Sequence, residues 1–109
     1  MSIKKKQTRE AFRQAVFARD KNTCRMCGTT HAKLDAHHII DRNDPDLPNQ
    51  GYVVENGITL CDDGKYSCHM KAEAFHNELK PEPGFSPNEL LKLIGSSRIE
   101  AIAAAGKLK

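Results

Sequence analysis

Residues 34–73 read LDAHHIIDRNDPDLPNQGYVVENGITLCDDGKYSCHMKAE, and the expected fold is built outward from them. The apolar residues at positions 34–41 lie between polar ones and predict a strand. Prolines and other turn formers at positions 41–51 predict an irregular loop. Glu55-Asn56-Gly57 is a strong turn signal, and positions 58–60 predict a second strand that leaves this turn. The stretch therefore predicts two short strands joined by a long loop.

The end of this stretch opens into a predicted helix that carries metal-type side chains. The run HMKAEAFHNELK, positions 69–80, contains good helix formers and no helix breaker before Pro81. Along it, His69, Glu73 and His76 are spaced i, i+4 and i+7. This spacing places all three side chains on one face of the helix.

Helices are also expected on both flanks. Positions 9–20 predict an amphipathic helix with Thr8 as its N-cap. Its apolar face is formed by Phe12, Val16 and Phe17. Residues 86–89, Ser-Pro-Asn-Glu, combine an N-cap serine, a proline at the first helical position and the glutamate of a capping box. Positions 99–105 predict a further helical segment that Gly106 ends.

The chain has four cysteines, which pair naturally around one ion. Cys24 and Cys27 flank two residues, and Gly28 permits the backbone angles that such a tight turn requires. A redox Cys-x-x-Cys pair would precede a helix in a βαβ pattern, which is absent here. Cys61 and Cys68 are separated by six residues, a longer loop than the common two to four. The four thiols predict a tetrahedral structural zinc site, the alternative being unpaired buried thiols.

His37 and His38 are adjacent on the first predicted strand. Neighbouring strand residues point to opposite faces, so the two imidazoles do not readily bind the same ion. The pair therefore suggests two different tasks, one histidine binding a metal and the other acting on water.

Four motifs in this order resemble the HNH endonuclease family, over about residues 9–77. They are Cys24-x-x-Cys27, Ala36-His37-His38-Ile39, ENGITLC at 55–61 and CHMKAE at 68–73. The resemblance is closest to the small phage-like and bacterial members. It implies an α+β fold with a ββα-metal core, a two-stranded antiparallel hairpin, flanking helices and the four-cysteine zinc site. On this basis residues 1–80 are the nuclease core with a basic N-terminal helix, and residues 81–109 are a helical extension packed on it.

The resemblance also implies roles for individual residues. His37 and His69 would bind the catalytic metal, with Glu73 as a further ligand. His38 would be the general base that activates the attacking water. Asn56 would tie the connecting loop to the strands and hold the base in position. The expected catalytic residues are therefore His37, His38, Asn56 and His69.

The donor set limits the choice of ion. Two imidazoles and at most one carboxylate suit Mn²⁺, Ni²⁺, Co²⁺ or Zn²⁺ better than Mg²⁺. Mg²⁺ remains an option because substrate phosphate and water complete its shell. Whether Glu73 or His76 is the third ligand stays open, and His31 is assigned no role.

Charge is distributed unevenly along the chain. The net charge is +3, but residues 1–33 hold nine lysines and arginines against two acidic residues, or +7, which leaves −4 for the remainder. A basic N-terminal third suits DNA, because neutralised phosphates release counterions. The alternative is a solubilising, solvated helix face. Arg42 and Lys71 are candidate phosphate contacts or simply solvated side chains. The expected partner is duplex DNA, bound with little sequence specificity, and the oligomeric state is left undetermined.

Length and composition favour one small domain whose core needs additional stabilisation by a disulfide or a bound metal. The chain has 109 residues, 6% aromatics and no tryptophan, so its core is modest. The charged residues 1–10 lack the apolar region of a secretory signal, and no apolar run is long enough for a membrane span. A cytoplasmic location is expected, which favours zinc over disulfides.

Three functions compete at this point. The first is a metal-dependent HNH endonuclease that hydrolyses DNA phosphodiester bonds by nicking or double-strand cleavage. The alternative is a non-catalytic zinc-binding module that docks on nucleic acid or protein, which would leave the histidines unused. The third is a thiol redox protein, which stoichiometric zinc would argue against.

Overall fold

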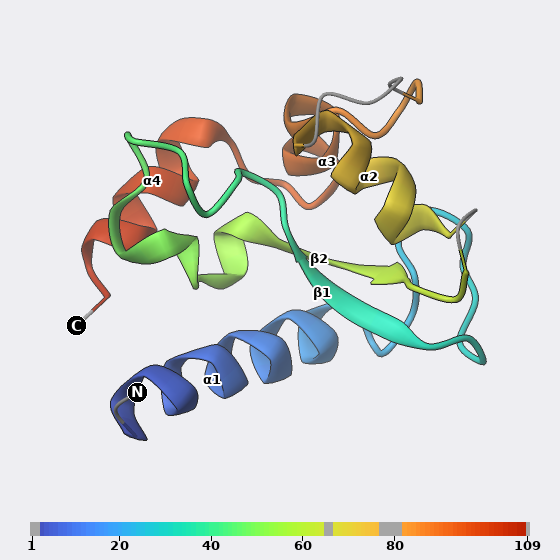
Figure 1. The fold of residues 1–109 in the computed structure, drawn as a ribbon, viewed down its shortest axis with the longest axis horizontal. Coiled ribbons are helices and arrows are strands. Elements are labelled where there is room, and N and C mark those ends of the chain that lie inside the picture. The colour runs from blue at the N-terminus through green and yellow to red at the C-terminus, as the bar shows by residue number, and fades with distance from the viewer. Residues whose placement is uncertain (1–2, 65–66, 77–81, 109) are drawn as a thin grey trace.

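The computed structural model describes residues 3–64, 67–76 and 82–108. The chain forms a small α+β fold with a two-stranded antiparallel hairpin and, among the described residues, four α-helices (Figure 1). In chain order these elements are α1 (Ile3–Arg19), β1 (Leu34–His38), β2 (Gly57–Cys61), α2 (Cys68–His76), α3 (Pro87–Leu93) and α4 (Arg98–Gly106). Two short 3-10 turns, Pro48–Gly51 and Val54–Asn56, lie in the loop between the strands.

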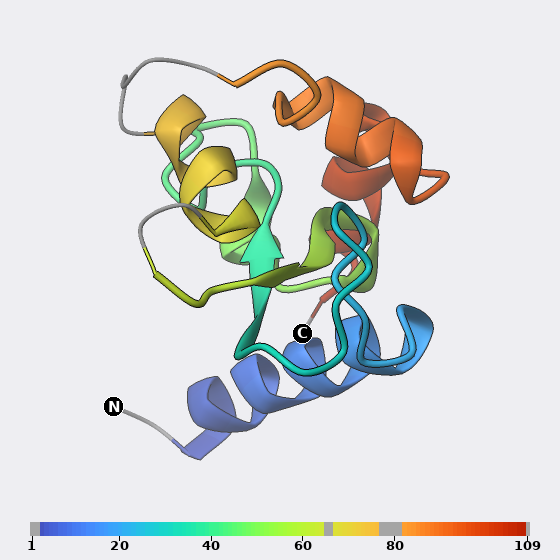
Figure 2. The same cartoon turned by 90° about the vertical axis from the view of Figure 1, so that its right-hand side faces the viewer.

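The hairpin lies between α1 and α2, which contact different faces of it (Figures 1 and 2). In its register Ala36 faces Thr59 and His37 faces Ile58. Because strand side chains alternate, Ala36 and His38 turn toward α1 while His37 turns toward α2. The two histidines are thereby placed on opposite sides of one strand.

Apolar side chains gather in two clusters that hold these layers together. The smaller one joins α1 to the hairpin and consists of Phe12, Val16, Ala36 and Tyr52. The larger one lies between the hairpin, α2 and the C-terminal helices. It includes Ile39, Ile58, Leu60, Ala72, Leu90, Leu91, Ala101 and Ala105. The contributions from α3 and α4 show that the C-terminal segment packs on the rest of the chain, which Figure 2 shows from the side.

Two element boundaries differ from those that the sequence predicted. The first helix begins at Ile3, so the assignment of Thr8 as its N-cap was wrong. Residues 3–8 continue the helix because they are mostly lysine and glutamine, which favour helix, and none is a breaker. The first strand ends at His38 instead of residue 41, because the Ile39 and Ile40 amides donate to Asn56 rather than to β2.

The C-terminal predictions were confirmed where the structure describes them. The Ser86 hydroxyl accepts from the Glu89 amide, and the Glu89 carboxylate accepts from the Ser86 amide, which completes the capping box that opens α3. The segment predicted at 99–105 is α4, Arg98–Gly106. Of the helix predicted at 69–80, residues up to His76 are helical, and 77–80 lie outside the described part.

A buried ion-pair network that the sequence analysis did not find joins α1 to β2. Asp20, just after α1, is 5% exposed. Its carboxylate accepts hydrogen bonds from Arg19 at 2.8 Å, Arg25 at 2.7 Å and the Thr59 amide at 2.9 Å. Arg19 also donates to the Gly57 carbonyl at 2.6 Å. The network therefore fixes α1, β2 and the turn that carries the first cysteine pair relative to one another.

Removing this carboxylate is expected to destabilise the fold. Asp20→Ala leaves Arg19 and Arg25 without their partner, and breaking one side of a buried pair lowers the free energy of unfolding by about 3 kcal/mol. Chemical denaturation at pH 7 measures this loss. The exposed Asp63 is the matched control, because Asp63→Ala is expected to change stability by less than about 0.5 kcal/mol.

The effect of Asp20 is expected to depend on pH. Burial alone raises the pKa of Asp20, but the hydrogen bonds from Arg19, Thr59 and Arg25 outweigh it and hold the pKa below the ordinary 3.8. The folded protein thus binds this proton more weakly than the unfolded chain, so the stabilisation is complete above about pH 4 and is lost as pH falls through the folded value. The difference in the free energy of unfolding between wild type and Asp20→Ala, measured by chemical denaturation, should become smaller below pH 3.8. If this difference in the free energy of unfolding stays constant down to pH 2, the ionised carboxylate of Asp20 does not stabilise the fold as described.

Two candidate metal sites

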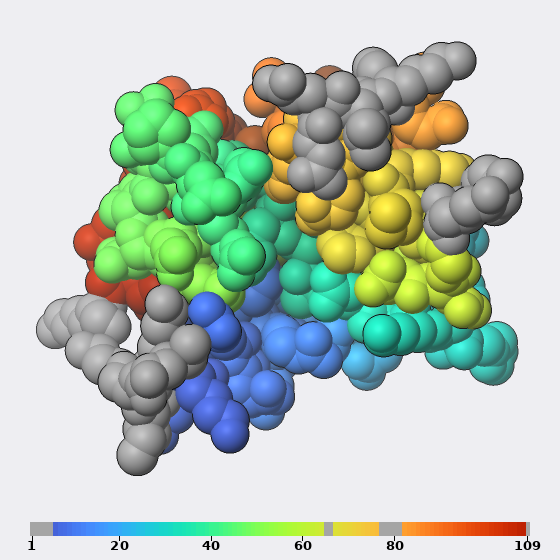
Figure 3. Space-filling model, in the orientation of Figure 1, coloured from blue at the N-terminus to red at the C-terminus, as the bar shows by residue number. Residues whose placement is uncertain are grey.

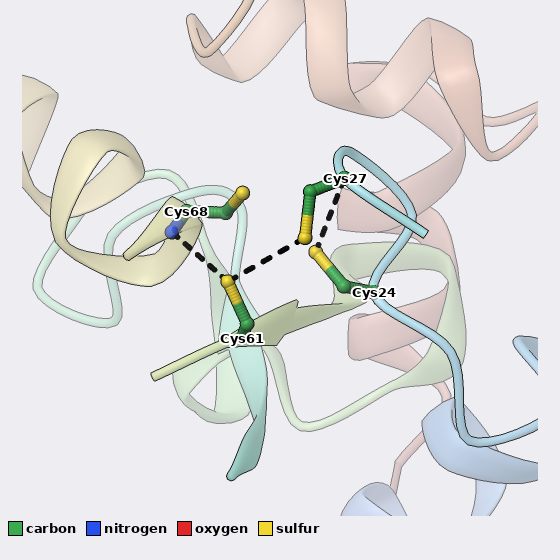
Figure 4. Close-up of side chains that lie close together, drawn as sticks. All are labelled: Cys24, Cys27, Cys61 and Cys68. Carbon is green, nitrogen blue, oxygen red and sulfur yellow. Dashed lines mark hydrogen bonds between the residues drawn. The ribbon is translucent and has the colours of Figure 1, made fainter. Parts of the chain in front are cut away.

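Four thiols from three elements converge beside the hairpin (Figure 4). Cys24 and Cys27 lie in the tight turn before β1, Cys61 ends β2 and Cys68 begins α2. Their sulfur atoms lie within 4.8 Å of one another, and all four cysteines are free. This group could hold a metal ion such as zinc.

The spacing of the sulfur atoms agrees with a tetrahedral ion. Zn–S bonds of about 2.3 Å place neighbouring sulfurs of a tetrahedron roughly 3.8 Å apart. The Sγ atoms of Cys27 and Cys61 are 3.8 Å apart. A disulfide would require about 2.05 Å. The geometry therefore matches four thiolate ligands better than a cross-link.

The local backbone explains how the thiols are presented. The Cys27 amide donates to the Cys24 sulfur at 3.5 Å, and the Cys68 amide donates to the Cys61 sulfur at 3.3 Å. In the long loop between the second pair, Gly64 has a φ of +98°, which favours glycine and turns the chain back toward Cys61. The six-residue separation is thus compatible with both sulfurs facing one ion.

The pKa values of Cys24 and Cys68 are shifted in opposite directions. Burial raises the pKa of Cys24, but amide hydrogen bonds led by that of Cys27 outweigh it and lower the pKa to about 7. Burial, followed by the neighbouring Cys61 thiol, raises the pKa of Cys68 well above its ordinary value. Metal binding requires thiolates and releases protons.

The second candidate site lies between β1 and α2. His37, Glu73 and His76 place ligand atoms within 4.8 Å of one another. His37 is 2% exposed, and its Nδ1 atom is buried without a hydrogen-bond partner among the described groups. That atom is 3.2 Å from Oε1 of Glu73, and Nε2 of His69 is 3.3 Å from the same oxygen. His69 thus contacts Glu73 without belonging to the mutual group of three.

These distances agree with ligands of one divalent ion. Metal–nitrogen and metal–oxygen bonds of about 2.1 Å place adjacent ligands roughly 3.0–3.4 Å apart, in octahedral or tetrahedral geometry. Both contacts to Glu73 fall in this range. An unpaired, buried imidazole nitrogen beside a carboxylate is the arrangement that a metal would complete. The residues present therefore fit a divalent ion.

An outer hydrogen bond orients His76, whereas the second nitrogen of His69 lies near a carboxylate without a hydrogen bond among the described groups. Nε2 of His76 is 3.0 Å from the Ile39 carbonyl. A carbonyl only accepts, so this nitrogen carries the proton, and the lone pair of Nδ1 points toward Glu73 at 3.9 Å. Nδ1 of His69 lies 3.3 Å from a carboxylate oxygen of Asp62. Metal-binding histidines commonly have such a carbonyl or carboxylate on their second nitrogen.

The protonation states suit metal binding. Burial lowers the pKa of His37, which therefore keeps a neutral ring. The close imidazoles of His37 and His69 lower the pKa of Glu73 well below its ordinary value, so it is a carboxylate. The hydrogen bond to Glu73 raises the pKa of His69. At neutral pH the centre thus offers an anionic oxygen and a neutral imidazole, the forms that bind divalent ions.

His38 leaves β1 on the opposite face and packs between two aromatic rings. Its ring stacks on Phe12 with centroids 4.5 Å apart and meets Tyr52 edge-on, also at 4.5 Å. Its Nε2 is buried without a hydrogen-bond partner among the described groups. Burial, followed by the charge of Arg42, lowers the pKa of His38 to about 3, so the ring is neutral at pH 7.

One cavity nevertheless connects both histidines. It has a volume of about 400 Å³ and is lined by Asp35, Ala36, His37, His38, Asp41, Arg42, Asn43, His69, Glu73 and His76. The four expected ligand and base residues therefore share one concave surface.

Asn56 is fully buried and supports this cavity from behind. Its Oδ1 accepts from the Ile40 amide at 2.8 Å. Its Nδ2 donates to the carbonyls of Ile40 and Gly51, each at 3.3 Å. Gly51 has a φ of +67°, and a Cβ there would lie 2.5 Å from Nδ2 of Asn56. The asparagine thus ties the chain after β1 to the end of the long loop.

The other residues considered in the sequence analysis differ in whether they line this cavity. His31 is exposed, and Nζ of Lys71 lies 5.6 Å from the centre of the Phe85 ring, so neither lines the cavity. Arg42 does line it. The sequence analysis missed Asp35, whose carboxylate is 3.4 Å from Nε2 of His69. Its position two residues before His37 on a strand was the available signal, because alternate residues share a face.

No known family model matches the chain, and no solved structure matches it significantly. Among the described helices, none has the length and apolar character needed to cross a membrane.

Proposed function

We propose that the protein is a metal-dependent HNH endonuclease with a ββα-metal core, a phosphodiester hydrolase that acts on duplex DNA with little sequence specificity. The observation that carries this proposal is the shared cavity. On one side His37, Glu73 and His76 place ligand atoms within 4.8 Å of one another, with His69 in contact with Glu73, and on the other side Nε2 of His38 is unpaired. In this proposal the four cysteines bind structural zinc and stabilise the fold.

The proposed chemistry divides the work between the two faces of β1. His37, His69 and Glu73, joined by His76, would hold Mn²⁺, Mg²⁺, Ni²⁺, Co²⁺ or Zn²⁺. The bound ion supplies a Lewis acid for the departing 3′ oxygen of the scissile phosphate. In this proposal His38 accepts the proton of the attacking water at Nε2, which has no hydrogen-bond partner among the described groups.

The packing around His38 supports its role as a base. A general base must hold its orientation, and the ring of His38 is confined between Phe12 and Tyr52. Asn56 positions the adjoining backbone through its three hydrogen bonds. Asn56 therefore acts as a positioning residue, without touching substrate.

A plasmid assay tests the proposal. Purified protein carrying its zinc is incubated with supercoiled DNA and each of the five divalent ions in turn. The expected result is conversion to nicked or linear plasmid by wild-type protein and none by the His38→Gln variant. Intact plasmid with every ion would remove the nuclease proposal and leave the second candidate.

That second candidate is a non-catalytic zinc-binding module, and the four-cysteine group favours it as much as the first. It assigns no ligand to the group formed by His37, Glu73 and His76. Binding of duplex DNA with no cleavage under any condition would support it.

The structure also predicts a contribution of His76 to metal affinity. Because the Ile39 carbonyl fixes Nε2 of His76, Nδ1 is directed at the ion position next to Glu73. His76→Ala is expected to weaken Mn²⁺ binding by about 10-fold or more. Isothermal titration of the zinc-loaded protein measures this, with the exposed His31→Ala as control. Equal affinity in both variants would show that His76 is not a ligand.

A further inference from the structure

A second cavity adjoins the first on the α1 side of the hairpin. It has a volume of about 190 Å³ and is lined by Arg9, Phe12, Arg13, Asp35, Ala36, His38, Arg42 and Tyr52. Asp35, Ala36, His38 and Arg42 line both cavities. Figure 3 shows the face on which α1, β1, the following loop and α2 meet. We call this second hollow the arginine cavity.

The arginine cavity gathers the three arginines that form no ion pair outside it with the described residues. Of the six in the chain, Arg19 and Arg25 are bound to Asp20, and Arg98 is bound to Asp44 and Asp46. The other three, Arg9, Arg13 and Arg42, line this one cavity. Against them stands one carboxylate, Asp35, so the charged lining sums to +2 (three minus one).

Tyr52 holds two of these guanidinium groups in place. The Arg9 guanidinium lies 5.9 Å from the centre of the Tyr52 ring, and Arg42 donates to the Tyr52 hydroxyl at 3.0 Å. Nε of Arg9 is buried and has no hydrogen-bond partner among the described groups. Arg13 is 3.6 Å from Asp35, an exposed ion pair of small strength. Arg9 thus offers the cavity a guanidinium group held against the Tyr52 ring, with one unsatisfied donor, Nε.

We propose that the arginine cavity binds a backbone phosphate of the nucleic-acid strand, the one next to the phosphate that is cleaved. The proposal rests on the nuclease function above and names a substrate contact of the same site. Planar guanidinium groups bind phosphate oxygens through paired hydrogen bonds. Phosphate contacts of this kind set the register of a strand without reading its sequence.

The arginine cavity and the cavity at the metal position have lining residues in common. This favours a phosphate of the cleaved strand, rather than an unrelated anion, as the ligand of the arginine cavity. His38 borders both cavities, so a group in the arginine cavity and a group at the metal position lie on either side of one imidazole. Consecutive phosphates of one strand are covalently linked, and in this proposal they occupy the two positions together. Binding in the arginine cavity would then align the scissile bond with His38.

Binding without cleavage tests this contact. The affinity of the zinc-loaded protein for a fluorescent duplex is measured by anisotropy at several salt concentrations, with no other divalent ion added. Arg9→Gln is expected to weaken binding by about 5–10-fold at 0.1 M salt and to reduce the slope of log K against log salt by about 0.9. The matched control is Lys92→Gln, which removes the same charge from α3, outside both cavities.

Two further variants keep the test decisive. Arg9→Lys retains the positive charge but removes the planar guanidinium group that can donate two parallel hydrogen bonds. It is expected to restore the slope of log K against log salt but only part of the affinity. Arg42→Gln is expected to act like Arg9→Gln, and a thermal melt shows whether loss of its bond to Tyr52 disturbs the fold. Mn²⁺ affinity should stay unchanged in Arg9→Gln.

The outcomes separate this inference from the proposed function. Wild-type protein that cleaves, with Arg9→Gln binding as tightly as Lys92→Gln, would overturn the arginine cavity alone. Equal slope changes in both variants would also overturn it, because they indicate diffuse attraction. Wild-type protein that shows the Arg9 effect but never cleaves would retain the phosphate contact and remove the nuclease. Protein that binds no duplex at any salt would overturn both.

Discussion

Replacing Cys27 with serine is expected to lower the free energy of unfolding by on the order of 5 kcal/mol, out of the ~10–16 kcal/mol that a structural zinc contributes. A domain of this size is stable by only about 5–15 kcal/mol in total. Most of the variant should therefore be unfolded at 37 °C. Circular dichroism melts with parallel zinc analysis measure the change.

Cys27 is the sharpest of the four positions for this test because its side chain is exposed. Without a metal, an exposed Cys→Ser change alters stability by less than about 0.5 kcal/mol. With zinc, the variant loses one of four ligands whose sulfurs lie within 4.8 Å. Wild-type protein treated with a zinc chelator should melt like the variant. A Cys27→Ser protein as stable as wild type, with no zinc in either, would leave the thiols without a metal.

Replacing His38 with glutamine is expected to reduce cleavage ~10²–10⁴-fold, the usual contribution of a positioned general base. Glutamine is the better choice than alanine, because the ring fills the space between Phe12 and Tyr52 and its deletion would leave a hole. Single-turnover nicking of supercoiled plasmid with saturating Mn²⁺ measures the rate.

The controls for His38 isolate chemistry from folding and metal binding. Mn²⁺ affinity and the melting temperature of His38→Gln should remain close to wild type, since Nε2 of His38 is not among the grouped ligand atoms. His31→Gln removes an exposed imidazole and should leave the rate unchanged. A His38→Gln variant that keeps a rate within threefold of wild type would assign the base to another group.

Short-range rules were sufficient for several elements. The capping box of α3 was predictable because Ser86 and Glu89 are three residues apart and their contacts depend only on the first helical turn. The opposite directions of His37 and His38 follow from strand alternation. The grouping of the four cysteines was predicted from their number and spacing, because few other arrangements satisfy four thiols.

Other features could not be obtained from spacing. Asp20 was counted only as a charge, since its partner Thr59 is 39 residues away and reaches it through the packing of α1 on β2. The strand was predicted too long because the Asn56 side chain, a distant residue, takes the Ile40 amide. Long-range hydrogen bonds of this kind depend on how whole elements meet, which residue patterns within one element do not specify.

In the candidate site, too, some features were evident from the sequence and others only from the tertiary structure. Residue type and order alone indicated thiols for a zinc ion and imidazoles for a second ion, because ligand chemistry belongs to each side chain. The tertiary structure decided that His37 of β1 meets Glu73 of α2, that the Ile39 carbonyl contacts His76, and that Arg9 of α1 meets Tyr52 of the loop. These partners lie on different elements, and only the packing of α1 and α2 against the two faces of one hairpin brings them within contact distance.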